Sequence, residues 1–409
     1  MSTRFHGDVR IVIGANYGDE GKGLMTDYFA AQGAEQGKRV LVVTSNGGAQ
    51  RGHTVTLPDG RRHVFHHFGS GTFARADTFL CRNFILNPIL YEEERSVLEK
   101  SGEDMTGRVF ADPFCIWSTP FDMIINQIVE EFRGKARHGS CGLGIWETIV
   151  RNRKCYIPFT RFEKDKNGLV RYLGQIRQEY LPWRLRKLGI PQIPSEWKNI
   201  LDDPALIRHY LDDFYSMTEH FGKSSDVLFH EYDRLVFENG QGLLLDRNHL
   251  EHREHTTPSN TGVRNPAAML EGIMGKSDVE VCYVTRTYLT RHGAGPFPYE
   301  CSMKELGVEI KDITNIPNPF QGTLRYGKID PAQLNVRIRE DLSCIPEKYR
   351  KGLRISLAVT HLNESGDKIL AGTEEDLKQF AEEVQIKNFY LSSGMDRNNL
   401  RVWSVGKNE

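Results

Sequence analysis

A glycine-rich segment near the start of the chain combines groups that bind phosphate with groups that move a proton. It reads Gly18-Asp19-Glu20-Gly21-Lys22-Gly23. Glycines let the backbone approach a phosphate closely, and Lys22 adds a positive charge. The segment departs from the pattern GxxxxGK followed by Ser or Thr, because only three residues separate Gly18 from Lys22 and a glycine follows the lysine. A carboxylate inside a phosphate cradle repels its ligand, so we expect Asp19 to hold a metal ion or to accept a proton.

A second polar segment directly follows an apolar run and reads Gly47-Gly48-Ala49-Gln50-Arg51-Gly52-His53-Thr54. An imidazole such as that of His53 can donate a proton to an oxygen on which negative charge develops. A lone histidine is more often structural, but the flanking glycines and the position after a strand favour a functional histidine here. The two segments therefore predict a site in which a phosphate, a carboxylate and an imidazole meet.

Short apolar runs must position these segments. Residues 8–14 predict a buried strand, residues 26–37 a helix that ends at glycine, and residues 38–46 a second buried strand. Such a unit builds a parallel sheet. Further strands of the same sheet are predicted by the apolar runs at 235–240, 279–287 and 353–361. Ligands of open parallel sheets bind where the strands end, so we expect the site at that edge.

The chain is predicted to be one α/β domain over residues 1–409, with a helical insertion at about 151–229 that is rich in charged and aromatic residues. The 53 basic and 54 acidic residues leave a net charge of -1, which gives no general attraction to nucleic acid or to membranes. No stretch approaches the ~20 apolar residues of a spanning helix, so we expect a cytoplasmic protein. The seven cysteines are dispersed without a CxxC pair, which favours reduced thiols over disulfides or a zinc site.

Several rare motifs, in one order, resemble the adenylosuccinate synthetase family. They extend from residue 9 to about residue 400 and are GDEGKG, GGAQRGHT, HFGSG, GSCGLG, ENGQGLLLD, PSNTG, TRTYLTRHGAGPFP and LRYGKID. The resemblance implies a large, mostly parallel sheet surrounded by helices, with a P-loop-like nucleotide-binding core. It implies a Mg²⁺-dependent ligase that joins aspartate to inosine monophosphate (IMP), with GTP phosphorylating the purine 6-oxygen and GDP and phosphate released. Phosphate leaves more readily than hydroxide, so the phosphorylation makes substitution by an amine accessible.

The resemblance also implies a role for each matching residue. Asp19 is expected to accept the proton of purine N1 and, with the Gly52 carbonyl, to bind Mg²⁺. His53 is expected to stabilise the 6-oxygen, and Lys22 and Gln241 complete the predicted catalytic set. The residues expected to bind the triphosphate are Gly18, Glu20, Gly21, Lys22, Gly23, Gly52, His53, Thr54, His361, Asn363, Ser393 and Gly394. Those expected to bind the monophosphate are Asp19, Gln50, Ser140, Cys141, Arg153, Gln241, Leu245 and Thr257. Those expected to bind the carboxylates of aspartate are Thr323 and Arg325.

Three departures from the family pattern bear on the substrates. The segment that reads guanine in the family is expected to be T-K-x-D, but here it is Thr360-His361-Leu362-Asn363. An amide offers one donor and one acceptor, which pair with adenine better than with guanine, so ATP or dATP is predicted as the phosphate donor. The aspartate loop carries only Arg325 where the family usually has several arginines, which weakens its hold on a dicarboxylate. The monophosphate pocket is also predicted to be altered, with Gln50, Ser140, Cys141 and Leu143 in place of the usual Asn, Thr, Thr and Arg.

Two alternatives and one assembly are also predicted. A viral branch of the family acts on dGMP with adenine nucleotides and shares the QGxxRxG form of the aspartate loop. That branch tends to have a small residue in place of the loop aspartate, whereas Asp19 is present, so IMP is the first expectation and dGMP the second. A nucleotide-binding regulatory protein without turnover is the alternative of another class. In the family an arginine reaches the nucleotide of the neighbouring subunit, so Arg151 or Arg153 is expected to act across a homodimer.

Overall fold

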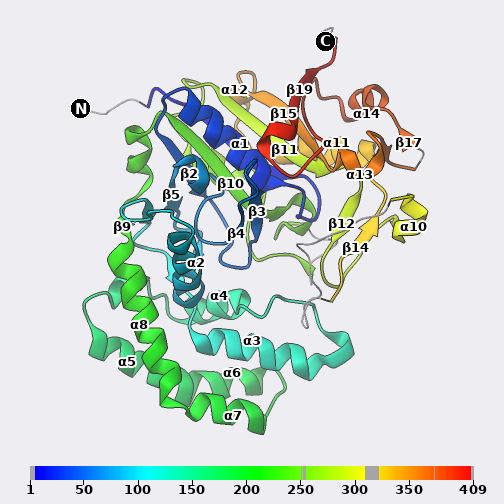
Figure 1. The fold of residues 1–409 in the computed structure, drawn as a ribbon. Helices are drawn as coiled ribbons and strands as arrows, with labels where there is room; N and C mark the ends of the chain where they lie inside the picture. The colour runs from blue at the N-terminus through cyan, green and yellow to red at the C-terminus, as the bar shows by residue number, and fades with distance from the viewer. Residues whose placement is uncertain (1–4, 250, 252–254, 309–321, 373, 407–409) are drawn as a thin grey trace.

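The central element of the fold is a ten-stranded sheet (Figure 1). The computed structural model describes residues 5–249, 251, 255–308, 322–372 and 374–406. The strands of the sheet are β1 (Asp8–Gly14), β2 (Val40–Thr44), β5 (Asp77–Leu80), β7 (Val109–Ala111), β9 (Gly222–Lys223), β10 (Arg234–Gly242), β11 (Val279–Arg286), β15 (Arg354–Thr360), β18 (Asn388–Ser392) and β19 (Leu400–Ser404). Their order is β19-β18-β15-β11-β1-β10-β2-β5-β7-β9, and all pairings are parallel except that of β18 with β19.

The five strands predicted from apolar runs are the five adjacent strands β15, β11, β1, β10 and β2. Each is buried along most of its length, as strands covered on both faces by helices must be. The predicted α/β class with a large, mostly parallel sheet is therefore confirmed.

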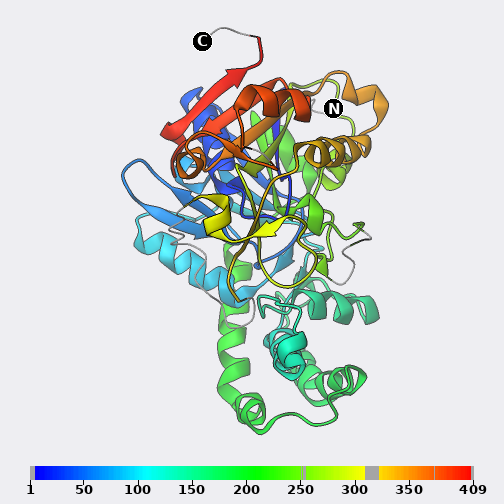
Figure 2. The ribbon, with the colours of Figure 1, turned by 90° about the vertical axis from the view of Figure 1, so that its right-hand side faces the viewer.

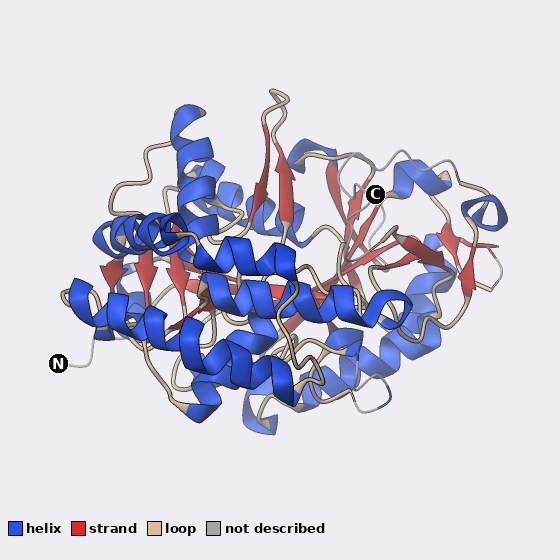
Figure 3. Cartoon of the chain, turned by 90° about the horizontal axis from the view of Figure 1, so that it is seen from below, coloured by secondary structure: helices blue, strands red, loops and turns tan. Residues whose placement is uncertain are grey.

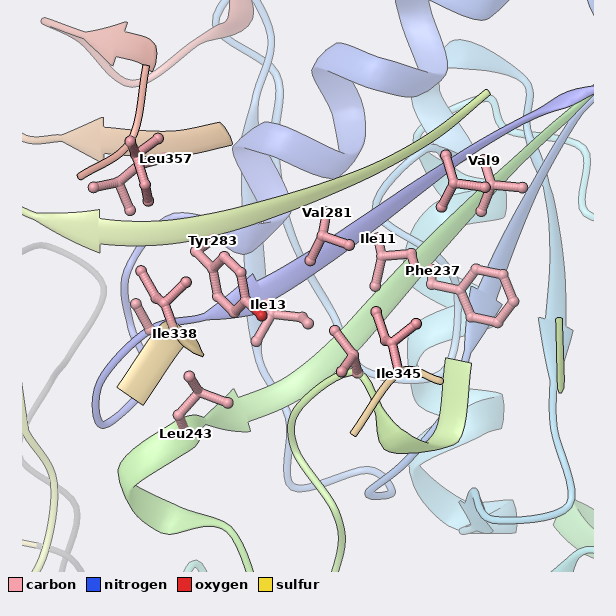
Figure 4. Packing of buried hydrophobic residues seen from close by; sticks show 14 of the residues in the cluster. Val9, Ile11, Ile13, Phe237, Leu243, Val281, Tyr283, Ile338, Ile345 and Leu357 are labelled. Carbon is pink, nitrogen blue, oxygen red and sulfur yellow. The ribbon is translucent and has the colours of Figure 1, made fainter. Parts of the chain in front are cut away.

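Strand β1 shows how the two faces of the sheet are covered. Ile11 and Ile13 belong to a buried cluster with Ile338 of α11 (Pro331–Ser343), as Figure 4 shows. Val12 points to the opposite face and belongs to a cluster with Phe29 of α1 (Lys22–Glu35). The sheet is thus held between α1 and α11, and the start of α1 is fixed next to the end of β1.

Two further groups of helices complete the chain. The helices that follow β10 in the chain, besides α11, are α9 (Arg264–Met269), α10 (Met303–Leu306), α12 (Glu347–Arg350), α13 (Leu362–Ser365) and α14 (Leu377–Val384). The helices that lie between β5 and β9 in the chain are α2 (Pro88–Lys100), α3 (Pro120–Arg133), α4 (Ile145–Lys154), α5 (Lys166–Gln175), α6 (Leu181–Lys187), α7 (Ser195–Asp202) and α8 (Pro204–His220).

Helices α3 to α8 lie below the sheet in Figures 1 and 2, and in front of its strands when the molecule is seen from below in Figure 3. Apolar side chains of α3 and of α5 to α8 form a second cluster with those of α2, which includes the buried Trp117. The residues 151–229 contain α5 to α8, but the limits of an insertion within one domain of 1–409 stay a prediction. In the described ranges, no helix combines the length and apolarity that a membrane crossing requires.

The remaining strands form small sheets beside the large one. They are β3 (His53–Thr56) with β4 (Arg62–Phe65), β6 (Ile85–Leu86) with β8 (Ile116–Trp117), β12 (Leu289–Arg291) and β13 (Glu300–Cys301) on either side of β14 (Arg325–Gly327), and β16 (Ile369–Leu370) with β17 (Glu374–Glu375).

Candidate active site

A cavity of about 1250 Å³ lies at the carboxyl ends of the central strands. Each of five neighbouring strands contributes to its lining near the strand's end: Gly18 after β1, Gln50 after β2, Gln241 in β10, Arg286 in β11 and His361 after β15. This is the edge at which the sequence predicts a ligand, because parallel strands direct their loops to one side of the sheet.

The predicted phosphate loop, residues 18–23, joins β1 to α1 and lines the cavity. Gly21 has φ 95°, which a side chain would disfavour, and a Cβ there would lie 2.9 Å from Thr360 Cγ2. Lys22 is buried at the first position of α1, where the helix also presents unpaired N–H groups with partial positive charge. The loop therefore offers backbone donors and a cation to an anionic ligand.

Glu20 ties this loop to the neighbouring strands. Its Oε1 accepts a hydrogen bond from the Asn16 backbone N–H at 2.6 Å, and the Asn16 side chain donates to the Thr285 hydroxyl at 3.0 Å. The Thr360 hydroxyl donates to the Glu20 carbonyl at 2.9 Å. Burial raises the pKa of Glu20 to about 7, although the charge of Lys22 acts in the opposite direction. The loop geometry is thus set by the ends of β11 and β15.

His53 is paired with a carboxylate that the sequence analysis missed. Glu238 is fully buried in β10, and its Oε1 lies 2.7 Å from His53 Nδ1. Burial acts to raise the pKa of Glu238, but the charges of His53 and Arg51 outweigh it and lower the pKa to about 2. Burial lowers the pKa of His53 to about 4, although Glu238 opposes this shift.

A neutral His53 therefore donates its Nδ1–H to Glu238, which leaves Nε2 as the nitrogen that can meet a ligand. The Ser70 hydroxyl also donates to Glu238. A signal for this pair was present in the sequence, because Glu238 is a charged residue within the apolar run 235–240, and a buried carboxylate requires partners.

Three residues of the cavity lining other than glycine have left-handed backbone conformations. Asp19, Gln241 and His361 have φ 55°, 68° and 63°. Such angles are strained for residues other than glycine and cluster at functional sites. Hydrogen bonds stabilise two of these conformations. Arg286 Nε donates to the Asp19 carbonyl at 2.5 Å, and His361 Nδ1 lies 2.7 Å from Thr360 Oγ1.

The Asp19 carboxylate is paired with His292, which the sequence analysis did not select. His292 Nε2 lies 2.7 Å from Asp19 Oδ2, and both residues line the cavity. Burial acts to raise the pKa of Asp19, but the hydrogen bond and charge of His292, and the charge of Arg286, lower it to about 2. Asp19 is therefore ionised. It lines the same cavity as His53, so the two residues predicted to act on one purine lie around one space.

The predicted monophosphate-binding residues line the same cavity and come mostly from loops: Asp19, Gln50, Ser140, Cys141, Arg153, Gln241, Leu245 and Thr257. Ser140 Oγ accepts a hydrogen bond from Asn126 Nδ2 at 2.8 Å, and its backbone N–H donates to Glu130 at 3.3 Å. Burial raises the pKa of the Cys141 thiol, so it lies in this wall as a neutral group.

The two arginines predicted for the subunit interface differ in environment. Arg151 is buried and donates to the Asp122 carboxylate at 2.8 Å and to the Trp117 carbonyl at 2.8 Å. Arg153 is exposed, lines the cavity, and stacks on Trp146 with its guanidinium carbon 5.1 Å from the ring centroid. Arg151 therefore serves the internal structure, whereas Arg153 lies at the cavity.

The predicted triphosphate-binding residues also meet at the cavity, with Ser393 as the exception: Gly18, Glu20, Gly21, Lys22, Gly23, Gly52, His53, Thr54, His361, Asn363 and Gly394 line it. Ser393 is exposed next to Gly394. Asn363 and Glu364 both lie in α13, but the Glu364 carboxylate accepts a hydrogen bond from the Tyr288 hydroxyl. The amide of Asn363 is exposed.

Thr323 and Arg325, predicted to bind aspartate, lie outside the cavity lining. Thr323 is exposed, and Arg325 forms an ion pair with Glu300 at 2.5 Å across the β13–β14 pairing. Arg325 also donates to the Gly293 carbonyl at 3.1 Å. The predicted aspartate loop covers residues 318–330, of which 318–321 lie outside the described residues, so this role stays a prediction.

The oxygen groups of the cavity fit a Mg²⁺ ion. Asp19 of the phosphate loop and Gly52 both line the cavity, and the Asp19 carboxylate is ionised. No group of three or more His, Cys, Asp or Glu side chains suited to a metal occurs among the described residues. Mg²⁺ is commonly held by one or two carboxylates together with water and ligand phosphates, which is what this donor set provides.

The amino-acid sequence is similar to those of known proteins of one family. The profile of the adenylosuccinate synthetase family matches residues 11–316. An adenylosuccinate synthetase of Chlorobium chlorochromatii is 25% identical over 398 residues, which are 94% of this chain and 80% of the relative. One of Alkalilimnicola ehrlichii is 30% identical over 307 residues, which are 74% of this chain and 66% of the relative.

Two solved structures share the fold. The fully ligated adenylosuccinate synthetase of Plasmodium falciparum has a TM-score of 0.69 at 17% identity, covering 96% of this chain and 99% of that one. The succinoaminodeoxyadenylate synthetase of cyanophage S-2L, bound to dGMP and to dATP as an energy donor, has a TM-score of 0.61 at 14% identity, covering 98% and 96%.

Proposed function

Because the chain belongs to the adenylosuccinate synthetase family, a family of ligases, we propose that it condenses L-aspartate with IMP to give adenylosuccinate. The observation that carries this proposal is that Asp19, Lys22, His53 and Gln241 line one cavity at the ends of adjacent strands. Activation of a purine oxygen requires a phosphate cradle, a proton acceptor and an imidazole at one place.

The proposed reaction has two steps. In the first, the 6-oxygen of the purine attacks the γ-phosphorus of a nucleoside triphosphate, the bond to the β-phosphate oxygen breaks, and N1 loses its proton. In the second, the amine of aspartate attacks C6, the bond from C6 to the phosphorylated oxygen breaks, and inorganic phosphate leaves with the former 6-oxygen and the proton that the amine loses. Lys22 and the N–H groups at the start of α1 stabilise the phosphate charge that moves in the first step.

Asp19 acts on N1 of the purine, and His53 acts on its 6-oxygen. The ionised Asp19 accepts the N1 proton, which places negative charge on the 6-oxygen. His53 meets that oxygen through Nε2 while Glu238 holds Nδ1 at 2.7 Å. An imidazolium between the Glu238 carboxylate and the oxyanion is stabilised from both sides, which offsets the burial that favours the neutral ring.

Mg²⁺ would be held by Asp19 and the Gly52 carbonyl, together with oxygens of the triphosphate. When bound, it neutralises phosphate charge and orients the γ-phosphate.

The phosphate donor is proposed to be ATP or dATP. Asn363 presents one donor and one acceptor, as adenine N1 and its amino group require. Glu364 could accept the two N–H donors of guanine, but its carboxylate is engaged by Tyr288. The variant Asn363→Asp is expected to raise kcat/KM for GTP relative to ATP by about tenfold or more, because one bidentate pair discriminates bases by about 1–3 kcal/mol. A wild-type enzyme that already prefers GTP would exclude this donor assignment.

The active site is proposed to be shared across a cytoplasmic homodimer, in which Arg153 reaches the nucleotide of the partner. The exposure of Arg153 in the single chain supports this, because a residue that contacts a second subunit must be accessible to it. Mixing two inactive variants, Asp19→Asn and Arg153→Leu, is expected to restore part of the activity, since a mixed dimer contains one site with neither substitution. Absence of any restoration, with mixed dimers shown to form, would contradict the shared site.

A substrate matrix tests the proposed function. IMP, dIMP, GMP and dGMP are each combined with ATP, dATP or GTP, Mg²⁺ and aspartate, and products are identified by mass spectrometry. A succinyl adduct of IMP is expected. An adduct of dGMP instead would assign the chain to the activity for which the cyanophage enzyme is named, with which it shares the fold. Nucleotide binding without product would indicate a regulatory protein.

A further inference from the structure

The contact between His292 and Asp19 is not used by the mechanism above. His292 directly follows β12, and its Nε2 lies 2.7 Å from Asp19 Oδ2. The two side chains are 26% and 31% exposed, so the pair lies at the wall of the cavity and not within the core. Asp19 is the proposed proton acceptor, so a group that contacts its carboxylate influences the reacting geometry.

The segment that carries His292 is held from several sides. Arg325 Nη1 donates to the carbonyls of Gly293 and Gly295 at 3.1 and 2.9 Å. Arg291 Nη2 donates to the Ala294 carbonyl at 2.9 Å. Gly293 has φ 70°, and a Cβ there would lie 3.1 Å from the Gly139 carbonyl oxygen. The imidazole is therefore attached to a well-fixed turn.

The backbone of Asp19 is fixed separately. Its φ of 55° is maintained while Arg286 Nε donates to its carbonyl at 2.5 Å. These contacts set the position of the Cα but leave the side-chain torsions undetermined. The hydrogen bond from His292 is the contact that selects one orientation of the carboxylate.

We propose that His292 is a positioning residue that holds Asp19 Oδ2, so that Oδ1 is presented to the purine. This inference rests on the proposed function, because it concerns the orientation of the proposed proton acceptor. A reacting group held in one orientation loses no freedom when the reaction occurs, and small displacements of such a group reduce the rate strongly.

Two substitutions separate a hydrogen-bonding role from a packing role. His292→Leu keeps the approximate size of the side chain and removes the donor. His292→Gln is the matched control, because its Nε2 amide donor can occupy the place of the imidazole Nε2. Both are compared with the wild type in kcat, in KM for each substrate, in calorimetric binding of the monophosphate, and in thermal stability.

The expected result is a fall in kcat of about tenfold to a hundredfold for His292→Leu, with KM for the triphosphate and binding of the monophosphate nearly unchanged. His292→Gln is expected to recover most of that loss. An unchanged kcat in His292→Leu would overturn the proposal. Equal losses in both variants with reduced thermal stability or weaker binding would also overturn it, since they indicate a structural role.

The wild type distinguishes this failure from that of the proposed function. If it forms a succinyl product, the His292 variants decide the inference alone. If it forms none with any pair of substrates, the proposed function falls and the inference with it, whatever the variants bind.

Discussion

The cavity has two walls of different construction. In the sheet wall, Lys22, His53 and Gln241 are attached to strands or to the start of α1, and a buried carboxylate, Glu238, supports one of them. In the loop wall, Ser140 is held by the half-buried Asn126 and the buried Glu130, which both belong to α3. The two walls face the same space but differ in what holds their polar groups, which is several strands in the sheet wall and a single helix in the loop wall.

This difference suggests that the sheet wall carries the groups that act in the reaction and the loop wall those that select the substrate. Groups that act in a transition state must be preorganised, and buried contacts from several strands provide this. Groups that only recognise a substrate contribute to ground state and transition state alike. We therefore expect substitutions in the sheet wall to lower kcat and substitutions in the loop wall to change KM.

The largest effect is expected for Asp19→Asn, which removes the proton acceptor with little change in shape. A general base contributes about 10²–10⁴-fold to rate, so kcat is expected to fall by about a thousandfold. Steady-state kinetics with IMP measures this, and thermal unfolding serves as the control that the variant is folded. A variant with kcat near that of the wild type would remove Asp19 from the mechanism.

Glu238→Gln is expected to have the next largest effect. The amide cannot provide the charge that favours a proton on His53, and partners of this kind affect activity by about 10- to 100-fold. Arg51 would also lose its buried counter-charge, so the midpoint of denaturant unfolding should fall. Stopped-flow and denaturation measurements test both parts. If kcat falls only in proportion to the folded fraction, Glu238 is purely structural.

Ser140→Ala tests the loop wall with a smaller expected effect. Loss of one hydrogen bond is worth about 1 kcal/mol, so KM for the monophosphate should rise about fivefold while kcat stays nearly constant. A fall in kcat as large as that of Glu238→Gln would contradict the separation of the two walls.

Asp341 lies away from both walls, so the substitution Asp341→Asn should not alter catalysis. Burial raises the pKa of Asp341 from 3.8 to about 7, although the Tyr283 hydroxyl acts to lower it. The native protein therefore binds a proton between these values that the unfolded chain has lost, so this group's contribution to stability declines as pH rises from 3.8 to about 7. Denaturant unfolding of wild type and variant across this window should show a flatter pH dependence in the variant. Parallel curves would contradict the assignment.

The parts of the fold that could be predicted are those fixed by local pattern. The apolar runs of β15, β11, β1, β10 and β2 each carry their own signal, and the position of Asp19 and His53 after strands follows from the parallel sheet. Glu238 was identifiable in principle as a charge within a buried strand. Its partner His53 is 185 residues away, and a single sequence gives no measure of such pairing.

Contacts between loops could not be predicted either, because they also join residues that are distant in the sequence. The pairing of His292 with Asp19 joins segments far apart in the chain. The ion pair of Arg325 with Glu300 likewise depends on the antiparallel pairing of β13 with β14, which no local pattern indicates. Motifs indicate which residue types a site contains, whereas the register of small sheets decides which of them meet.

The central claim, that the purine 6-oxygen is phosphorylated in this cavity, can be tested by isotope transfer. IMP carrying ¹⁸O at the 6-position is incubated with the protein, ATP, Mg²⁺ and aspartate, and the released inorganic phosphate is analysed by mass spectrometry. Each phosphate released with adenylosuccinate is expected to carry one ¹⁸O atom. Release of unlabelled phosphate together with the succinyl product would contradict it.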